Sequence, residues 1–218
     1  MSAIFDTMSP RSFEQLVQAL AIAVFGSGVR VYGDGPDAGR EASIEGEVPY
    51  PTQEDRWRGY TVIQVKFRLK PTGDTRDADW LVKQLQAEAK KFSSPERKLR
   101  CPDNYLLVSN VSLSSIESPS TTSAASTPPK KGVKRRPPRG GQQKLEDAAK
   151  RAKNVLWKQG FDWWHADKLE RLLENHEGIR RRYAAWLTTG DVIADVVSWI
   201  ALKRVDFDRA ITQYLQRC

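Results

Sequence analysis

The chain has 218 residues, of which 39% are hydrophobic and 28% charged, and its formal net charge is +8 at pH 7. This length is enough to bury a hydrophobic core without disulfides, and the two cysteines, Cys101 and Cys218, exclude a disulfide-rich scaffold and a zinc knuckle. No stretch reaches the roughly 20 apolar residues of a membrane helix, and the first residues lack the pattern of a signal peptide. We therefore expect a soluble, cytoplasmic protein without a membrane partner.

One short segment carries most of the positive charge. Residues 130–139, KKGVKRRPPR, hold six basic residues and no acidic one, and without them the formal charge would be +2. The net charge alone is therefore weak evidence for a DNA-binding fold. The segment itself is either a phosphate-binding arm with salt-dependent affinity or a solvated insertion, and both interpretations stay open.

The first half of the chain predicts an α/β layout. Ser9 is a typical helix N-cap, Pro10 suits the first helical position, apolar residues follow at helical spacing, and Gly26 ends the pattern. The further patterns predict, in chain order, a helix over 10–25, strands over 29–32 and 41–45, a polar connection over 46–58, a strand over 60–67, a helix over 77–92 and a strand over 105–111.

The strand over 60–67 has the clearest alternation in the chain. Because side chains alternate between the two faces of a strand, one face should carry Ile63, Val65 and Phe67 and the other Val62, Gln64 and Lys66. A lysine beside a glutamine on such an apolar strand is costly to bury without partners. Nearby carboxylates and a metal ion would supply those partners.

The second half of the chain begins with a break in the pattern. Residues 112–141 are first Ser/Thr/Pro-rich and then Lys/Arg/Pro-rich, which predicts a disordered insertion. Beyond it, the patterns predict a helix over 145–157, a strand over 161–164, and helices over 166–187, 191–202 and 206–215. We therefore expect one domain over 1–187, with the insertion at 112–141, and a helical appendage over 188–218.

Five polar residues in the first half are candidates for phosphodiester chemistry. They come from the first helix, the Gly-rich turn, the start of the next strand and the strand over 60–67, namely Glu14, Asp37, Glu41, Gln64 and Lys66. Carboxylate and amide oxygens suit Mg²⁺, which neutralises developing charge and activates a bound water. A nearby ammonium can orient that water and stabilise the transition state.

At these residues the sequence resembles a known family. Phe13-Glu14, the segment GPDAGRE at 35–41 and the segment VIQVKF at 62–67 resemble the Mrr-like branch of the PD-(D/E)xK nucleases. More narrowly, they resemble the N-terminal nuclease modules of bacterial anti-phage effectors, including STAND-type NTPases such as the Avs proteins. The resemblance covers residues 9–110 and continues more loosely through 160–167 and 180–183. It implies a restriction-endonuclease-like mixed sheet flanked by helices, and DNA cleavage with Mg²⁺ or, alternatively, Mn²⁺.

The resemblance also implies roles for the five candidates. Glu41 takes the place of the acid that starts the second strand, Gln64 and Lys66 take the Gln-x-Lys positions, and Glu14 takes the helix acid. The metal ligands would be Glu41, Gln64 and Asp37. The family usually has aspartate where Glu41 stands, and the extra methylene moves the carboxylate by more than about 1 Å, against a tolerance of about 0.5 Å. We expect reduced activity or compensation by Asp37.

Three functions remain open from the sequence. The first is an Mg²⁺-dependent DNA endonuclease in anti-phage defence or restriction. The second is a weakened nuclease-fold module that binds DNA or an NTPase partner without cutting, through the basic residues Lys130, Lys131, Lys134, Arg135, Arg136 and Arg139. The third is an assembly protein whose C-terminal helices form a homo-oligomer or recruit a partner through Val192, Val196, Trp199 and Ile200. The chain contains no phosphate-binding loop of the GxxxxGK[ST] type, so any NTPase sensor would be a separate partner.

Overall fold

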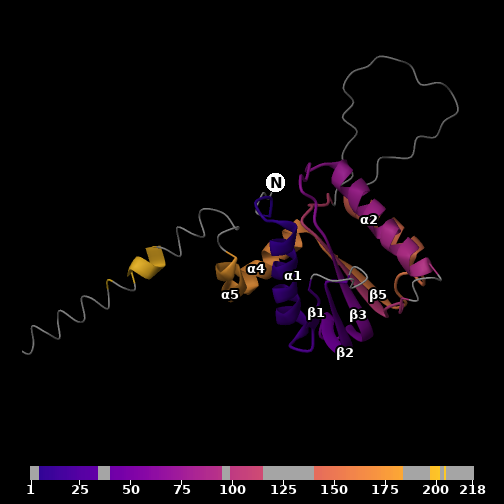
Figure 1. The fold of residues 1–218 in the computed structure, drawn as a ribbon, viewed down its shortest axis with the longest axis horizontal. Helices are drawn as coiled ribbons and strands as arrows, with labels where there is room; N and C mark the ends of the chain where they lie inside the picture. Colours follow the sequence, from indigo (N-terminus) through magenta and orange to yellow (C-terminus); the bar gives the residue numbers. More distant parts are fainter. Residues whose placement is uncertain are drawn as a thin grey trace, which may run out of the picture.

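The computed structural model describes residues 5–33, 40–94, 99–114, 140–183, 197–201 and 204. Its elements in chain order are α1 (Pro10–Phe25), β1 (Arg30–Val31), β2 (Ala42–Pro51), β3 (Arg56–Lys66), α2 (Thr75–Ser93), β4 (Asn104–Ser109), α3 (Gly141–Ala152), β5 (Gly160–Trp164), α4 (Ala166–Asn175) and α5 (Glu177–Arg182). The strands form one sheet in the order β1-β2-β3-β4-β5. The β1-β2-β3 pairs are antiparallel and the β3-β4-β5 pairs are parallel. The predicted α/β fold with a mixed sheet flanked by helices is confirmed (Figure 1).

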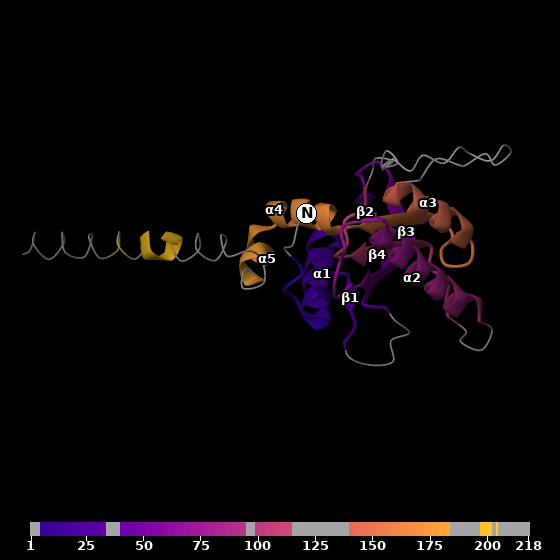
Figure 2. The same cartoon turned by 90° about the horizontal axis from the view of Figure 1, so that it is seen from above.

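Each face of the sheet packs against its own set of helices. In Figure 2, α1, α4 and α5 lie on one side of the sheet, and α2 and α3 lie on the other. Ile63 and Val65 of β3 join the apolar cluster on the α1 side, and Val62 joins the cluster on the α2 side. The alternation predicted for this strand is therefore confirmed. Because both faces are covered along the second half of β3, a polar residue there, such as the buried Gln64, must find its partners inside the protein.

Helix α1 has the boundaries that the sequence predicts. The Ser9 hydroxyl accepts a hydrogen bond from the Ser12 backbone N–H at 3.0 Å, which satisfies one of the free donors at the helix start. Pro10 is the first helical residue, and Gly26 ends the helix with a φ of +97°, a conformation that favours glycine. The helix buries Phe13 and other apolar side chains against the sheet. Because Glu14 is the residue after Phe13, this packing also fixes where Glu14 lies.

The prediction of a polar connection over 46–58 is wrong, because β2 and β3 form a hairpin there. Glu47 pairs with Arg58 in the ladder, and the register shifts between Val48 and Pro51. Strand β1 pairs only with the first two residues of β2, so the rest of β2 is an edge of the sheet. A proline is tolerated on an edge, where no neighbour needs its missing N–H. The prolines in this segment therefore do not exclude a strand, although they made the sequence look like a connection.

Two predicted helices have different boundaries in the structure. The helix predicted over 145–157 is α3, which starts at Gly141 and ends at Ala152, because Lys153 has a non-helical ψ of 143°; Asn154 follows with a left-handed φ of +68°. The helix predicted over 166–187 is divided into α4 and α5 by His176, which has φ −127° and ψ 67°. The predicted strand over 161–164 is confirmed as β5.

The described residues cover the predicted insertion and the predicted appendage only in part. Residues 115–139 lie outside the described residues, but their flanks meet, because Gly141 donates from its backbone N–H to the Ser114 hydroxyl at 3.2 Å. Of the predicted C-terminal helices, 197–201 and 204 are described and helical, and Trp199 and Ile200 are exposed there. Val192, Val196 and the helix predicted over 206–215 lie outside the described residues. Within the described ranges, no helix is long and apolar enough to cross a membrane.

Candidate functional site

The structure brings together the predicted residues from three elements. Glu41 lies directly before β2, beside Gln64 and Lys66 at the end of β3, and Glu14 of α1 is close enough for its charge to raise the pKa of Glu41. Asp37 lies outside the described residues, as do the six basic residues of 130–139. Four of the five candidate residues therefore form one cluster, and the DNA-binding arm stays a prediction.

The backbone of Glu41 is held on both sides. Its carbonyl accepts hydrogen bonds from the Gln18 side-chain amide at 3.1 Å and from the Tyr32 N–H at 3.0 Å. Its N–H donates to the Ile63 carbonyl of β3 at 3.3 Å. Helix α1, the end of β1 and the central strand thus fix this position together. The sheet therefore anchors the backbone of Glu41, although this residue comes just before the first residue of β2.

The Glu41 carboxylate is bound by groups of β3. The Gln64 amide nitrogen donates to Glu41 Oε1 at 3.2 Å, and the Val65 backbone N–H donates to Oε2 at 2.8 Å. The pKa of Glu41 is raised from 4.5 to about 8, mainly because the side chain is buried; the Glu14 charge adds to this rise, while the Val65 N–H and the Lys66 ammonium oppose it. Without a cation, Glu41 is therefore mostly protonated at neutral pH.

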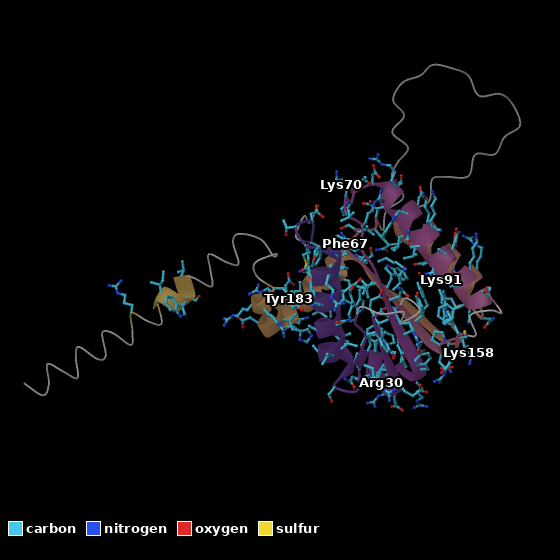
Figure 3. The ribbon with its side chains drawn as sticks, viewed as in Figure 1. Arg30, Phe67, Lys70, Lys91, Lys158 and Tyr183 are labelled. Atoms are coloured by element: carbon cyan, nitrogen blue, oxygen red, sulfur yellow. The ribbon has the colours of Figure 1, made fainter. Side chains whose placement is uncertain are left out.

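Lys66 pairs with a buried acid that the sequence analysis missed. Its ammonium lies 2.7 Å from Glu88 Oε1, and the ammonium of Lys91 lies 2.7 Å from the same oxygen. Glu88 is only 1% exposed, whereas the Lys66 side chain keeps 16% of its surface accessible. Lys91 is labelled on α2 in Figure 3. Helix α2 thus holds the Lys66 ammonium at the boundary between the core and the surface.

Further buried oxygen atoms belong to the Lys66–Glu88 pair itself, to the register partner of Lys66, or to a residue that feels the Glu88 charge. Glu88 Oε2, the Tyr105 hydroxyl and the Ser109 hydroxyl have no hydrogen-bond partner among the described residues. Ser109 of β4 is the register partner of Lys66. Burial raises the pKa of Tyr105 well above its ordinary value, and the charges of Glu88 and Glu41 add to this effect. The polar cluster therefore extends from β3 to α2 and β4.

The sequence did contain a signal for Glu88. Leu81, Leu85 and Phe92 define the apolar stripe of the predicted helix, and Glu88 stands three residues after Leu85, on the same stripe. An acid at a position where the helical period calls for an apolar residue needs a buried partner. Asp77 stands four residues before Leu81, on the same apolar stripe, and it is also buried.

The oxygen atoms at this site are of the types that Mg²⁺ prefers as ligands. Within the described residues, no group of three or more His, Cys, Asp or Glu side chains could hold a metal ion. Mg²⁺, however, is usually bound by one or two carboxylates together with water and substrate phosphates. Glu41 and Glu14 offer two carboxylates, and the Gln64 amide oxygen remains an acceptor because the amide nitrogen faces Glu41. A cation there would favour the ionised form of a carboxylate that is otherwise buried and neutral.

Comparison of the chain with protein-family models, with curated proteins and with solved structures gives no match.

Proposed function

We propose that this chain is an Mg²⁺-dependent nuclease that hydrolyses phosphodiester bonds of DNA, as an effector of anti-phage defence or restriction. The observation that carries the proposal is the cluster of Glu41, Gln64 and Lys66, with Glu14 beside it. The acid that precedes β2 is hydrogen-bonded by the Gln-x-Lys strand, so the order of the motif in the sequence and its arrangement in space agree. The resemblance to the Mrr-like nucleases supports the same function.

Each residue has a definite task in this proposal. Glu41, Gln64 and Glu14 would hold the ion, which supplies a Lewis acid that lowers the pKa of a bound water. The Gln64 amide and the Val65 N–H orient the Glu41 carboxylate. Lys66, the partly exposed cation of the cluster, would donate to the attacking water or to a phosphate oxygen. Glu88 acts through Lys66 and is a positioning residue.

Lys66→Ala tests this proposal. The substitution leaves Lys91 on Glu88, so the buried carboxylate keeps a cation and the fold should remain stable. Plasmid DNA would be incubated with the wild type and the variant, in Mg²⁺ and in EDTA. We expect cleavage only by the wild type and only with metal. Lys70→Ala is the matched control, since this exposed lysine lies four residues further on (Figure 3) and should not affect cleavage. Normal cleavage by a folded Lys66→Ala protein would refute the proposal.

One observation favours binding without cutting as the second candidate. Lys66 is bound to Glu88 rather than to Glu41, and Glu41 is neutral at pH 7 without a cation. A protein that stays in this arrangement would bind DNA through charge alone. This second function predicts that the affinity for DNA does not depend on Mg²⁺ and decreases with salt, mainly because of residues 130–139. Unchanged affinity after deletion of 130–139 would contradict it.

A further inference from the structure

A row of aromatic rings extends from the sheet to its open edge. Phe161 and Trp163 project from the same face of β5, and the Phe161 ring stacks on Trp157 with the centroids 4.4 Å apart. The Trp163 ring lies next, with its centroid 5.9 Å from that of Phe161. Trp164 points to the opposite face and is fully buried there, whereas Trp163 and Phe161 are only half-buried. The row therefore ends in aromatic surface that the described core does not cover.

A cavity of about 310 Å³ lies over these rings. Its walls are the three aromatic side chains and the end of α3, and Lys150, Lys153 and Glu146 stand at its rim. β5 is the last strand of the sheet, so the cavity faces the side of the molecule. Its volume is at the lower end for small-molecule sites, which suits one flat ring system. Lys158, labelled in Figure 3, marks the turn that leads into β5.

We propose that this cavity, called the β5 pocket below, binds one base of single-stranded nucleic acid by stacking. The flat rings supply the surface on which a base stacks, and Lys150 and Lys153 supply charge for the neighbouring phosphates. Two rim lysines against one rim acid, Glu146, give the pocket a positive balance that complements an anion. Both lysines are exposed, Lys150 on α3 and Lys153 directly after it, so they suit a phosphate backbone that passes along the rim.

The same features favour a strand over two other ligands. A free nucleotide would need enclosed donors for its phosphate, and both basic residues of the lining are on the rim. Duplex DNA keeps its bases paired and stacked, so a duplex presents no base face to the rings unless a base is extruded. The proposal concerns binding alone, and it does not depend on cleavage at Glu41 and Lys66.

The test is the affinity of the full chain for a short fluorescent oligothymidylate, measured by anisotropy in EDTA so that no metal-dependent cleavage occurs. Trp163→Ala should weaken binding about tenfold or more, as for loss of one stacked base. Trp163→Phe should restore most of the affinity, and Trp163→Leu, which keeps apolar bulk in the pocket, should not. Trp80→Ala is the control, because Trp80 is a half-buried indole of α2 on the same face of the sheet. It should bind as the wild type does.

An abasic oligonucleotide separates stacking from charge. It keeps the phosphates and removes the bases, so Trp163→Ala and the wild type should bind it equally. Exchange of Lys150 and Lys153 for alanine should reduce the salt dependence of binding to either strand, and Lys83→Ala, an exposed lysine of α2, should not. The proposal is overturned if folded Trp163→Ala and Trp163→Leu proteins bind oligothymidylate as tightly as the wild type. It is also overturned if a free mononucleotide competes as well as the oligonucleotide.

Discussion

Glu41→Gln removes a carboxyl group whose pKa differs strongly between the folded and the unfolded chain. The pKa is about 8 in the folded protein and 4.5 without its environment, so the native carboxyl keeps a proton that the unfolded chain has released. Raising the pH between these values therefore favours unfolding, and the free energy of unfolding falls by up to about 1.4 kcal/mol for each pH unit. Between pH 5 and pH 7 the contribution of Glu41 falls by about 2 to 3 kcal/mol. The glutamine variant lacks this contribution.

The measurement is urea unfolding of the wild type and Glu41→Gln in EDTA at pH 5 and pH 7, followed by far-UV circular dichroism. The difference between the two proteins isolates Glu41 from the other titrating groups, and Glu54→Gln, in the exposed β2–β3 turn, is the matched control. At pH 7, Mg²⁺ should stabilise the wild type and leave Glu41→Gln unchanged, since a ligand stabilises the state that binds it. An equal loss of stability in the wild type and Glu41→Gln between pH 5 and pH 7 would refute the assignment of a buried, neutral carboxyl.

Three further substitutions test the surrounding structure. Asp77→Ala leaves Arg68 without the buried carboxylate that lies 2.6 Å away, and it should lower the free energy of unfolding by about 3 kcal/mol in urea titrations. Gly160→Ala would place a Cβ 2.6 Å from Trp57 Nε1, so we expect a loss of about 1–3 kcal/mol, seen as a lower Tm. Glu88→Gln should lower kcat for DNA cleavage and leave KM nearly unchanged. The substitution removes the carboxylate that positions the Lys66 ammonium, but it keeps Lys66 itself.

Each of these substitutions has a control in which the same residue type is changed at an exposed or uncrowded position. Asp79→Ala removes an acid of α2 that is half exposed, so it should cost less than about 1 kcal/mol. Gly178→Ala adds a Cβ in open space within α5, where alanine is the better helix former, and should not lower the Tm. Glu174→Gln removes an exposed acid of α4 and should leave kcat unchanged. Equal effects of a substitution and its control would contradict the reasoning for that site.

The sequence correctly predicted those helices and strands whose apolar residues recur at the spacing of the face that is buried in the fold. Helix α1 has a cap, a periodic apolar face and a glycine at its end, and all three are found in the structure. Strand β3 has a clear alternation, so Gln64 and Lys66 could be placed on one face before the fold was known. The hairpin was missed because its prolines lie on a stretch of β2 that only β3 pairs with.

Local sequence patterns could predict which face of an element a site residue occupies, but not which residues of other elements it contacts. The position of Glu41 beside Gln64 depends on the β2–β3 register, which motif order indicates but local periodicity does not. The Lys66–Glu88 pair joins β3 to α2 across 22 residues of sequence, and no pattern within either element states that they meet. Tyr105 and Ser109 reach the same cluster through the parallel pairing of β4 with β3, which is again a property of the fold.

The contact between Ser114 and Gly141 has an evolutionary consequence. The Ser114 hydroxyl and carbonyl bind the N–H groups of Gly141 and Gln142, both at 3.2 Å, so the chain that leaves at 114 returns at the same point. The stretch between them has no distance to span, and each doubling of its length would cost only about 0.6 kcal/mol in loop closure. Its length and charge can therefore change between relatives, or be shortened by design, without altering the register of the strands that hold Glu41 and Lys66.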